Sequence, residues 1–110
     1  MSKLHKKKCL ACTTGTPPLS AQESNELLGQ LHASWQLSTN GHLVCHFGFD
    51  DFISALHFTN QVGIIAEAEG HHPNILLTWG NCQVEIWTHK IDGLSESDFV
   101  LAAKIDQLRT

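Results

Sequence analysis

Two turn signals constrain the fold of this chain more than any other feature. Asn40-Gly41 and Gly80-Asn81 each lie between two short apolar segments that are rich in aromatic and β-branched residues. Asparagine and glycine tolerate the positive backbone angles of tight turns, so each signal predicts a β-hairpin. The four predicted strands comprise residues 35–37, 43–47, 74–79 and 82–89.

Segments with helical spacing of apolar residues precede, separate and follow the two hairpins. Ser20 and Glu23 have the spacing of a capping box, which predicts a first helix over residues 21–31. Ser95 and Asp98 repeat this spacing and predict the start of the last helix. Both helices therefore have defined first turns.

The middle helix is the longest predicted element. Asp50 or Asp51 caps its start, and Gly70 ends it because glycine readily adopts the left-handed conformation that follows many helices. Its apolar residues recur three or four positions apart, a spacing that suits packing on a sheet. The predicted buried stripe comprises Phe52, Leu56, Thr59, Val62, Gly63 and Ala66.

The predicted order of elements is therefore α-β-β-α-β-β-α. Strands linked by hairpins are antiparallel, so the simplest arrangement is an α+β fold, a four-stranded antiparallel sheet with three helices packed on one face. Residues 1–19 lack periodicity and contain a proline pair, and we expect an N-terminal tail or arm there. Residues 20–110 are expected to form a single domain, as suits a chain of 110 residues.

Composition disfavours several classes of function. The formal net charge of -4 at pH 7 disfavours a protein that binds nucleic acid by neutralising phosphates. No apolar run is long enough to span a bilayer and no signal-peptide pattern is present, so we expect a cytoplasmic protein without membrane contacts. Cys9 and Cys12 have the spacing of a redox or zinc pair, but no second such pair accompanies them. We interpret them as reduced thiols.

The segment Gly70-His71-His72-Pro73 is the strongest candidate for a functional site. Its two adjacent histidines stand between a glycine and a proline, which both redirect the backbone. Glu67 lies one turn before His71, a spacing that lets its carboxylate orient this histidine. The downstream residues expected to face the segment are Trp79, His89 and Asp98.

The register of the second hairpin decides whether distant histidines meet. If Gly80-Asn81 forms the two-residue loop, Trp79 faces Cys82. Continuing by twos along both strands then places His72 opposite His89, on the less apolar face. A one-residue slip would remove this pairing.

The residue types favour proton-transfer chemistry. Histidines exchange protons near neutral pH, so a cluster of them suits acid-base catalysis of a dehydration or isomerisation. The sequence has no Gly-x-Ser-x-Gly elbow, no phosphate-binding glycine loop and no dinucleotide fingerprint. One alternative is a metal site made from His71 or His72, His89, and Glu67 or Asp98, but adjacent residues of an extended segment point to opposite faces. Another is that His71 only caps the middle helix.

The spaced positions resemble the signature of a known family. They comprise Glu67, His71-His72-Pro73, Trp79, His89 and Asp98. They look like the motif of the pterin-4a-carbinolamine dehydratases, and the resemblance extends from Ala11-Cys12 into the last helix. It implies a four-stranded antiparallel sheet with three helices, without a metal or an organic cofactor. It also implies a hydro-lyase that converts 4a-hydroxytetrahydropterin to quinonoid dihydropterin and water, in tetrahydrobiopterin recycling.

The resemblance also implies roles for individual residues. The catalytic and pterin-contacting residues would be His71, His72 and His89. The substrate-binding residues would be Glu67, Gly70, Trp87, Thr88 and Asp98, with the carboxylates supporting the histidines. We expect His71 to protonate the leaving hydroxyl and His89 to receive or relay the second proton. Some relatives carry an acidic residue at the position of Gly70, so the local charge differs here.

Partners follow from the same resemblance. The substrate is a small-molecule pterin, an aromatic amino acid hydroxylase is the expected partner in the pathway, and a homodimer or homotetramer is the expected assembly. The alternative is a non-catalytic binding or regulatory protein, because animal members also act as a dimerisation cofactor for a transcription factor. A further branch is linked to molybdopterin metabolism. The intact set of three histidines favours catalysis.

Overall fold

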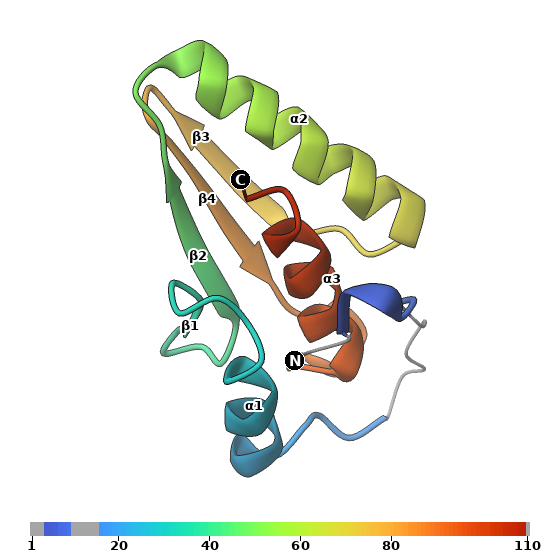
Figure 1. The fold of residues 1–110 in the computed structure, drawn as a ribbon. Helices are drawn as coiled ribbons and strands as arrows, with labels where there is room; N and C mark the ends of the chain where they lie inside the picture. The colour runs from blue at the N-terminus through green and yellow to red at the C-terminus, as the bar shows by residue number, and fades with distance from the viewer. Residues whose placement is uncertain (1–3, 10–15, 110) are drawn as a thin grey trace.

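This computed structural model describes residues 4–9 and 16–109. In these residues, the fold is an antiparallel sheet with the strand order β1-β2-β4-β3, accompanied by three α-helices (Figure 1). The elements are α1 (Ala21–Leu28), β1 (Gln36–Leu37), β2 (Leu43–Gly48), α2 (Phe52–Glu69), β3 (Asn74–Thr78), β4 (Asn81–Ile86) and α3 (Glu96–Asp106), with 3₁₀ turns η1 (Leu4–Lys6) and η2 (His89–Ile91). The predicted fold class and element order are confirmed. Helix α1 is three residues shorter than predicted because Gly29 follows it as the C-cap.

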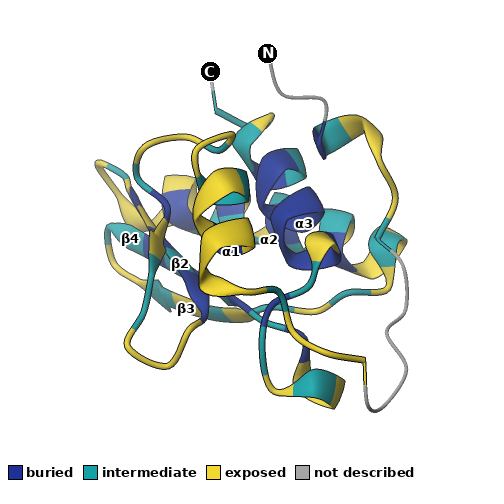
Figure 2. Ribbon diagram, turned by 90° about the horizontal axis from the view of Figure 1, so that it is seen from below, coloured by how far each residue is buried: buried dark blue, intermediate teal, exposed yellow. Residues whose placement is uncertain are grey.

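The helices cover one face of the sheet. Side chains along β2 and β4 alternate between buried and more exposed positions, which shows that one face of these strands points into the core. The core-facing residues are Leu43, Cys45, Phe47, Cys82, Val84 and Ile86. Helices α2 and α3 lie on this side, as Figures 1 and 2 show.

The first hairpin turns where predicted, through a three-residue loop. The backbone N–H of Ser38 donates to the carbonyl of His42 at 2.8 Å, and the N–H of Gly41 donates to Ser38 at 2.9 Å. Gly41 has a φ of 77°, whereas Asn40 keeps a negative φ. This combination is typical of a hairpin loop that ends in a left-handed glycine.

The register of the second hairpin differs from the prediction by two residues. Leu77 pairs with Cys82, so the loop is Trp79-Gly80 rather than Gly80-Asn81. The chain before α2 explains the shift, because the N–H of Phe49 donates to the carbonyl of Gly80 at 2.8 Å. A Cβ atom on that glycine would lie 2.9 Å from the carbonyl oxygen of Phe49. The glycine is needed for this close approach and not for a positive φ.

The predicted cross-strand pairing of His72 with His89 is therefore wrong. The ladder between β3 and β4 ends at the pair Asn74 and Glu85, and His89 lies in η2. If the observed register were continued, His72 would lie across from Trp87. A two-residue shift keeps each side chain on its face of the sheet but gives it different neighbours.

Helix α2 begins after Asp51 and ends before Gly70, as predicted. The side chain of Asp51 accepts a hydrogen bond from the N–H of Ser54 at 2.8 Å. The buried stripe differs from the prediction and comprises Ala55, Phe58, Val62 and Ala66. Phe52 is 44% exposed. The helix is apolar on more than one side, so periodicity alone does not single out the side that packs on the sheet.

Helix α3 is buried on nearly all sides. Residues 97–103 are all buried, because α3 packs against α2 and η1 and its side chains join those of the sheet in one core (Figure 2). Leu4 of η1 is 3% exposed and belongs to the core. The Nζ atom of Lys104 donates to the carbonyl of His5 at 3.0 Å. Residues 4–9, within the predicted tail or arm, thus lie against the last helix.

Two expectations from composition concern membranes and cysteines. Across residues 4–9 and 16–109, no helix combines the length and apolarity needed to cross a bilayer. Cys9, Cys45 and Cys82 are free thiols. Cys12 lies outside the described residues.

Candidate active site

The site begins where α2 ends. Gly70 is the C-cap in the left-handed conformation, with a φ of 65°, and its N–H donates to the carbonyl of Glu67 at 3.2 Å. The N–H of His71 donates to the carbonyl of Ala66 at 3.2 Å. A left-handed residue reverses the direction of the chain after a helix. The side chain of His71 can therefore contact the start of α3, which lies beside this loop.

Asp98 holds His71 in place. One oxygen of Asp98, Oδ1, lies 2.5 Å from Nε2 of His71. The other, Oδ2, accepts hydrogen bonds from the Thr88 hydroxyl and from the Ser95 N–H, each at 2.8 Å. The carboxylate is fully buried, and such a group needs this many donors to offset its loss of water. Because a carboxylate only accepts, we assign a proton to Nε2 of His71, which leaves Nδ1 for exchange with a ligand.

His72 pairs with Glu67, which corrects the prediction that Glu67 orients His71. Nε2 of His72 lies 2.8 Å from Oε1 of Glu67, and both side chains are largely exposed. The helical spacing that predicted the other pair no longer applies past the left-handed residue Gly70. An exposed pair of this kind contributes little to stability, so its position beside the His71 loop is its main significance.

His89 stacks on Trp87. The ring centroids are 4.1 Å apart and the planes differ by 12°. His42 stacks on Trp87 as well, with centroids 4.0 Å apart and planes that differ by 2°. His89 is exposed, Trp87 is half-buried and His42 is buried. The indole thus supports the ring of His89.

Thr88 connects the two histidine groups. It lies between Trp87 and His89 in the chain and is buried. Its N–H donates to the carbonyl of Gly93 at 2.9 Å, and its hydroxyl donates to Asp98. The carboxylate that holds His71 therefore also fixes the backbone that carries His89.

Not all residues expected to face the site do so. Trp79 is 68% exposed in the loop between β3 and β4, at the far end of β3 from His72.

Within the described residues, no group of three or more histidine, cysteine, aspartate or glutamate side chains could hold a metal ion.

Sequence reasoning missed two residues that support the site, His42 and Glu85, and assigned Ser95 only its helix cap with Asp98, which the structure confirms. Nδ1 of His42 lies 2.6 Å from Oε2 of Glu85. The hydroxyl of Ser95 lies 2.9 Å from that of Thr88. The correct β2–β4 register is the signal that would find His42, because it places this residue beside Trp87.

Cys9, near the N-terminus, contacts Glu69 at the end of α2 and Ser97 in α3. The N–H of Cys9 donates to Oε1 of Glu69 at 2.9 Å, and Lys104 lies 3.6 Å from the other oxygen. The hydrogen bond from Cys9 and the charge of Lys104 lower the pKa of Glu69 below its usual range. Burial, and then the negative charge of Glu69, raise the pKa of the Cys9 thiol to about 12. Cys9 is therefore a neutral thiol near pH 7 and a poor nucleophile.

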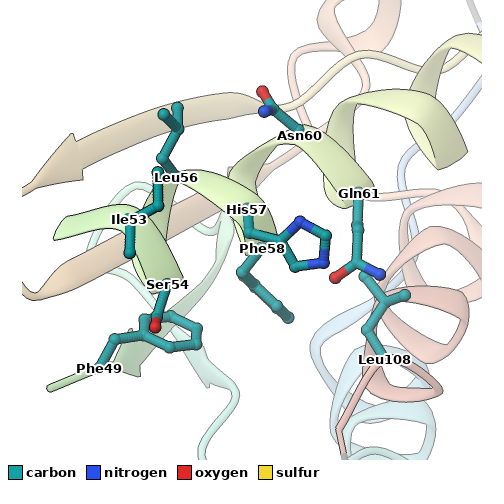
Figure 3. Close-up of a pocket in the computed structure, with 9 residues that line it drawn as sticks. All are labelled: Phe49, Ile53, Ser54, Leu56, His57, Phe58, Asn60, Gln61 and Leu108. Carbon is teal, nitrogen blue, oxygen red and sulfur yellow. The ribbon is translucent and has the colours of Figure 1, made fainter. Parts of the chain in front are cut away.

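A separate pocket of about 630 Å³ lies along the first half of α2 (Figure 3). Its lining residues are Phe49, Ile53, Ser54, Leu56, His57, Phe58, Asn60, Gln61 and Leu108. None of them belongs to the histidine site. The shape of this pocket therefore says nothing about the chemistry at His71 and His89.

Comparisons with known proteins show which family this chain is similar to. The family model described as pterin 4 alpha carbinolamine dehydratase matches residues 17–108. A protein of Alkaliphilus metalliredigens, named as a candidate pterin-4-alpha-carbinolamine dehydratase, is 51% identical over 97% of this chain and 96% of its own length. A protein of Rubrobacter xylanophilus with the same name is 47% identical over 98% of this chain and 100% of its own length.

Solved structures show the same fold. The crystal structure of a transcriptional coactivator/pterin dehydratase from Brucella melitensis has a TM-score of 0.79 and 30% identity, over 84% of this chain and 99% of its own. A pterin dehydratase-like protein described as a RuBisCO assembly factor in the alpha-carboxysome has a TM-score of 0.60 and 23% identity, over 70% of this chain and 90% of its own. This second likeness supports the fold alone. With the match to the family model over residues 17–108, these relatives show that the chain belongs to the pterin-4-alpha-carbinolamine dehydratase family.

Proposed function

We propose that this protein is a hydro-lyase that converts 4a-hydroxytetrahydropterin to quinonoid dihydropterin and water, with histidines as general acid and base. Membership of the family supports the substrate class and the reaction. The observation that carries the histidine mechanism is the contact between Asp98 and Nε2 of His71, at 2.5 Å. It fixes the orientation of the ring and leaves Nδ1 for proton exchange.

The reaction needs one proton delivered and one removed. The bond between C4a and the hydroxyl oxygen breaks after the oxygen receives a proton, and water leaves. The lone pair of the neighbouring ring nitrogen forms a double bond to C4a, and that nitrogen then loses its own proton. Two groups with different protonation states serve these steps, and acid-base help of this kind contributes about 10²- to 10⁴-fold.

The histidines divide these tasks in our proposal. His71 donates a proton from Nδ1 to the leaving hydroxyl, and His89 receives or relays the proton from the ring nitrogen. His72 and Glu67, both exposed, contact the pterin at the open side. Trp87 and the backbone of Thr88 form the wall behind His89.

The wider role in this proposal is tetrahydrobiopterin recycling in the cytoplasm. An aromatic amino acid hydroxylase would generate the substrate, and the protein would act as a homodimer or homotetramer without a metal or organic cofactor.

A stopped-flow assay tests the proposal. A hydroxylase generates the 4a-hydroxytetrahydropterin, and its decay is followed with and without this protein. We expect the wild-type protein to accelerate the decay. We expect His71→Ala to lower the accelerated rate by about 100-fold or more and so to remove most of the acceleration. His57→Ala, at an exposed position on α2 outside the site, is the matched control and should retain wild-type rates.

Two results would contradict the proposal. If the intermediate decays no faster with wild-type protein than without it, the proposed enzymatic activity is rejected. A regulatory role would then be favoured, for which the described coactivator from Brucella melitensis is the precedent. Equal rates for wild type and His71→Ala would retain the enzyme but reject His71 as the acid.

A further inference from the structure

We propose that His42 is a positioning residue for His89 and acts through Trp87. The inference rests on the proposed function, because that function assigns a proton transfer to His89. His42 lies 47 positions before His89 in the sequence and outside the family motif, and it reaches the site only through the sheet.

The three rings form a continuous stack. His42 and His89 lie 4.0 and 4.1 Å from Trp87 between centroids, in planes nearly parallel to the indole. Two imidazoles so close to one centroid cannot fit side by side on the same face, so they cover opposite faces. The strand register agrees, because the pair Leu43 and Ile86 places His42 beside Trp87 one residue further along. The indole is thus held between the two histidines.

His42 is the fixed end of this stack. Its residue is 9% exposed, and its Nδ1 lies 2.6 Å from Oε2 of Glu85. Glu85 belongs to β4 and pairs with Val44 of β2, and His42 directly precedes β2. His42 is therefore held by both central strands. A ring anchored in this way limits the rotation of the neighbouring indole.

His89 is the free end. It is exposed and lies in the 3₁₀ turn after β4, where an unsupported side chain would exchange between rotamers. Its stack on Trp87 restricts the ring to one plane. Proton transfer depends strongly on distance and angle, so a loosened stack should lower turnover more than substrate binding.

A set of substitutions at His42 separates stacking from the hydrogen bond to Glu85. His42→Leu removes both the ring and the hydrogen bond, whereas His42→Phe keeps an aromatic ring and removes only the hydrogen bond. Any difference between the two variants therefore reports the stack. His46→Leu is the matched control, because His46 is exposed and lies in β2 on the same face of the sheet as His42.

Two readouts are measured on the full chain. The first is kcat and KM for decay of the carbinolamine in the stopped-flow assay. We expect His42→Leu to lower kcat about tenfold and to change KM by less than about twofold, and His42→Phe and His46→Leu to stay within about twofold of wild type. The second is the chemical shift of the carbon-bound ring protons of His89, which the indole ring current moves upfield. We expect His42→Leu to lose this shift and His42→Phe to keep it.

Equal kcat values for His42→Leu and His42→Phe, whether lowered or not, would overturn the inference. If wild-type protein does not accelerate the decay, the proposed function fails. The chemical shifts alone then decide whether His42 positions the ring of His89. Unchanged His89 shifts in His42→Leu would then overturn it, and their loss in His42→Leu but not in His42→Phe would support it. Should His42→Leu not fold, His42→Gln replaces it as the variant without an aromatic ring.

Discussion

At the residue scale, one buried carboxylate joins the two parts of the site. Asp98 contacts His71 through one oxygen and Thr88 and Ser95 through the other. Burial of a carboxylate costs several kcal/mol unless donors surround it, so all three partners are also held in place. The site is rigid on this side because the group that costs most free energy to bury, the Asp98 carboxylate, is also the group with the most hydrogen-bond partners.

The same scale shows which partners could be predicted. His71, His72 and the two carboxylates Glu67 and Asp98 were recognisable from their spacing, but each histidine has a different partner from the expected one. Helical spacing predicts contacts only within a helix, and Gly70 reverses the chain between Glu67 and the histidines. Contacts across such a reversal depend on tertiary packing, which spacing does not encode.

Glu69 gives a prediction about pH. Its lowered pKa means that the ionised carboxylate stabilises the folded protein, most fully above its ordinary value of 4.5. This stabilisation is lost as the pH falls through the folded-state value. We expect Glu69→Gln to lower the free energy of unfolding at pH 7, and the difference from wild type to shrink at about pH 3. Urea unfolding of both proteins at both pH values measures this, and a difference that stays constant or grows in acid would disprove it.

At the element scale, the ends of helices and hairpins position the site more than their middles do. Local turn signals predicted both hairpins, yet the second register depends on the contact between Gly80 and Phe49, two segments that are distant in sequence. That contact moved the loop by one residue and the cross-strand partners by two. A register set by tertiary contact cannot be read from the turn alone.

Two glycines, one inside α2 and one that caps its end, give a matched prediction. Gly70 has a φ of 65°, which strains any side chain, whereas Gly63 lies within the helix, and a Cβ atom there would have nothing within 4 Å. We expect Gly70→Ala to lower the free energy of unfolding by about 1–2 kcal/mol and Gly63→Ala to raise it by about 0.5–1 kcal/mol. Thermal and urea unfolding measure both. Equal changes of the same sign in the free energy of unfolding would show that the backbone conformation of residue 70 does not determine the effect of the substitution.

At the scale of the whole molecule, the last helix brings distant parts of the chain together. Its start carries Asp98, and its end carries Asp106, which accepts a hydrogen bond from Nε1 of Trp35 at 2.8 Å. Its sides contact α2 and the 3₁₀ turn that contains Leu4, and its buried side chains share one core with the sheet (Figure 1). The order of elements was predictable because periodicity and caps are local. The stack of His42, Trp87 and His89 was not, because it depends on how β2 aligns with β4 and on the 3₁₀ turn that follows β4.

The central claim is that Asp98 acts on catalysis through His71. A double-mutant cycle of His71→Ala, Asp98→Asn and their combination, with kcat/KM measured by stopped flow for each protein that remains folded, tests it directly. We expect the double variant to be about as slow as His71→Ala alone. The amide oxygen that Asp98→Asn retains can still accept the hydrogen bonds from Thr88 and Ser95, so this substitution changes only the contact that acts through His71. Losses that multiply in the double variant would show that the two side chains act independently and would contradict the account.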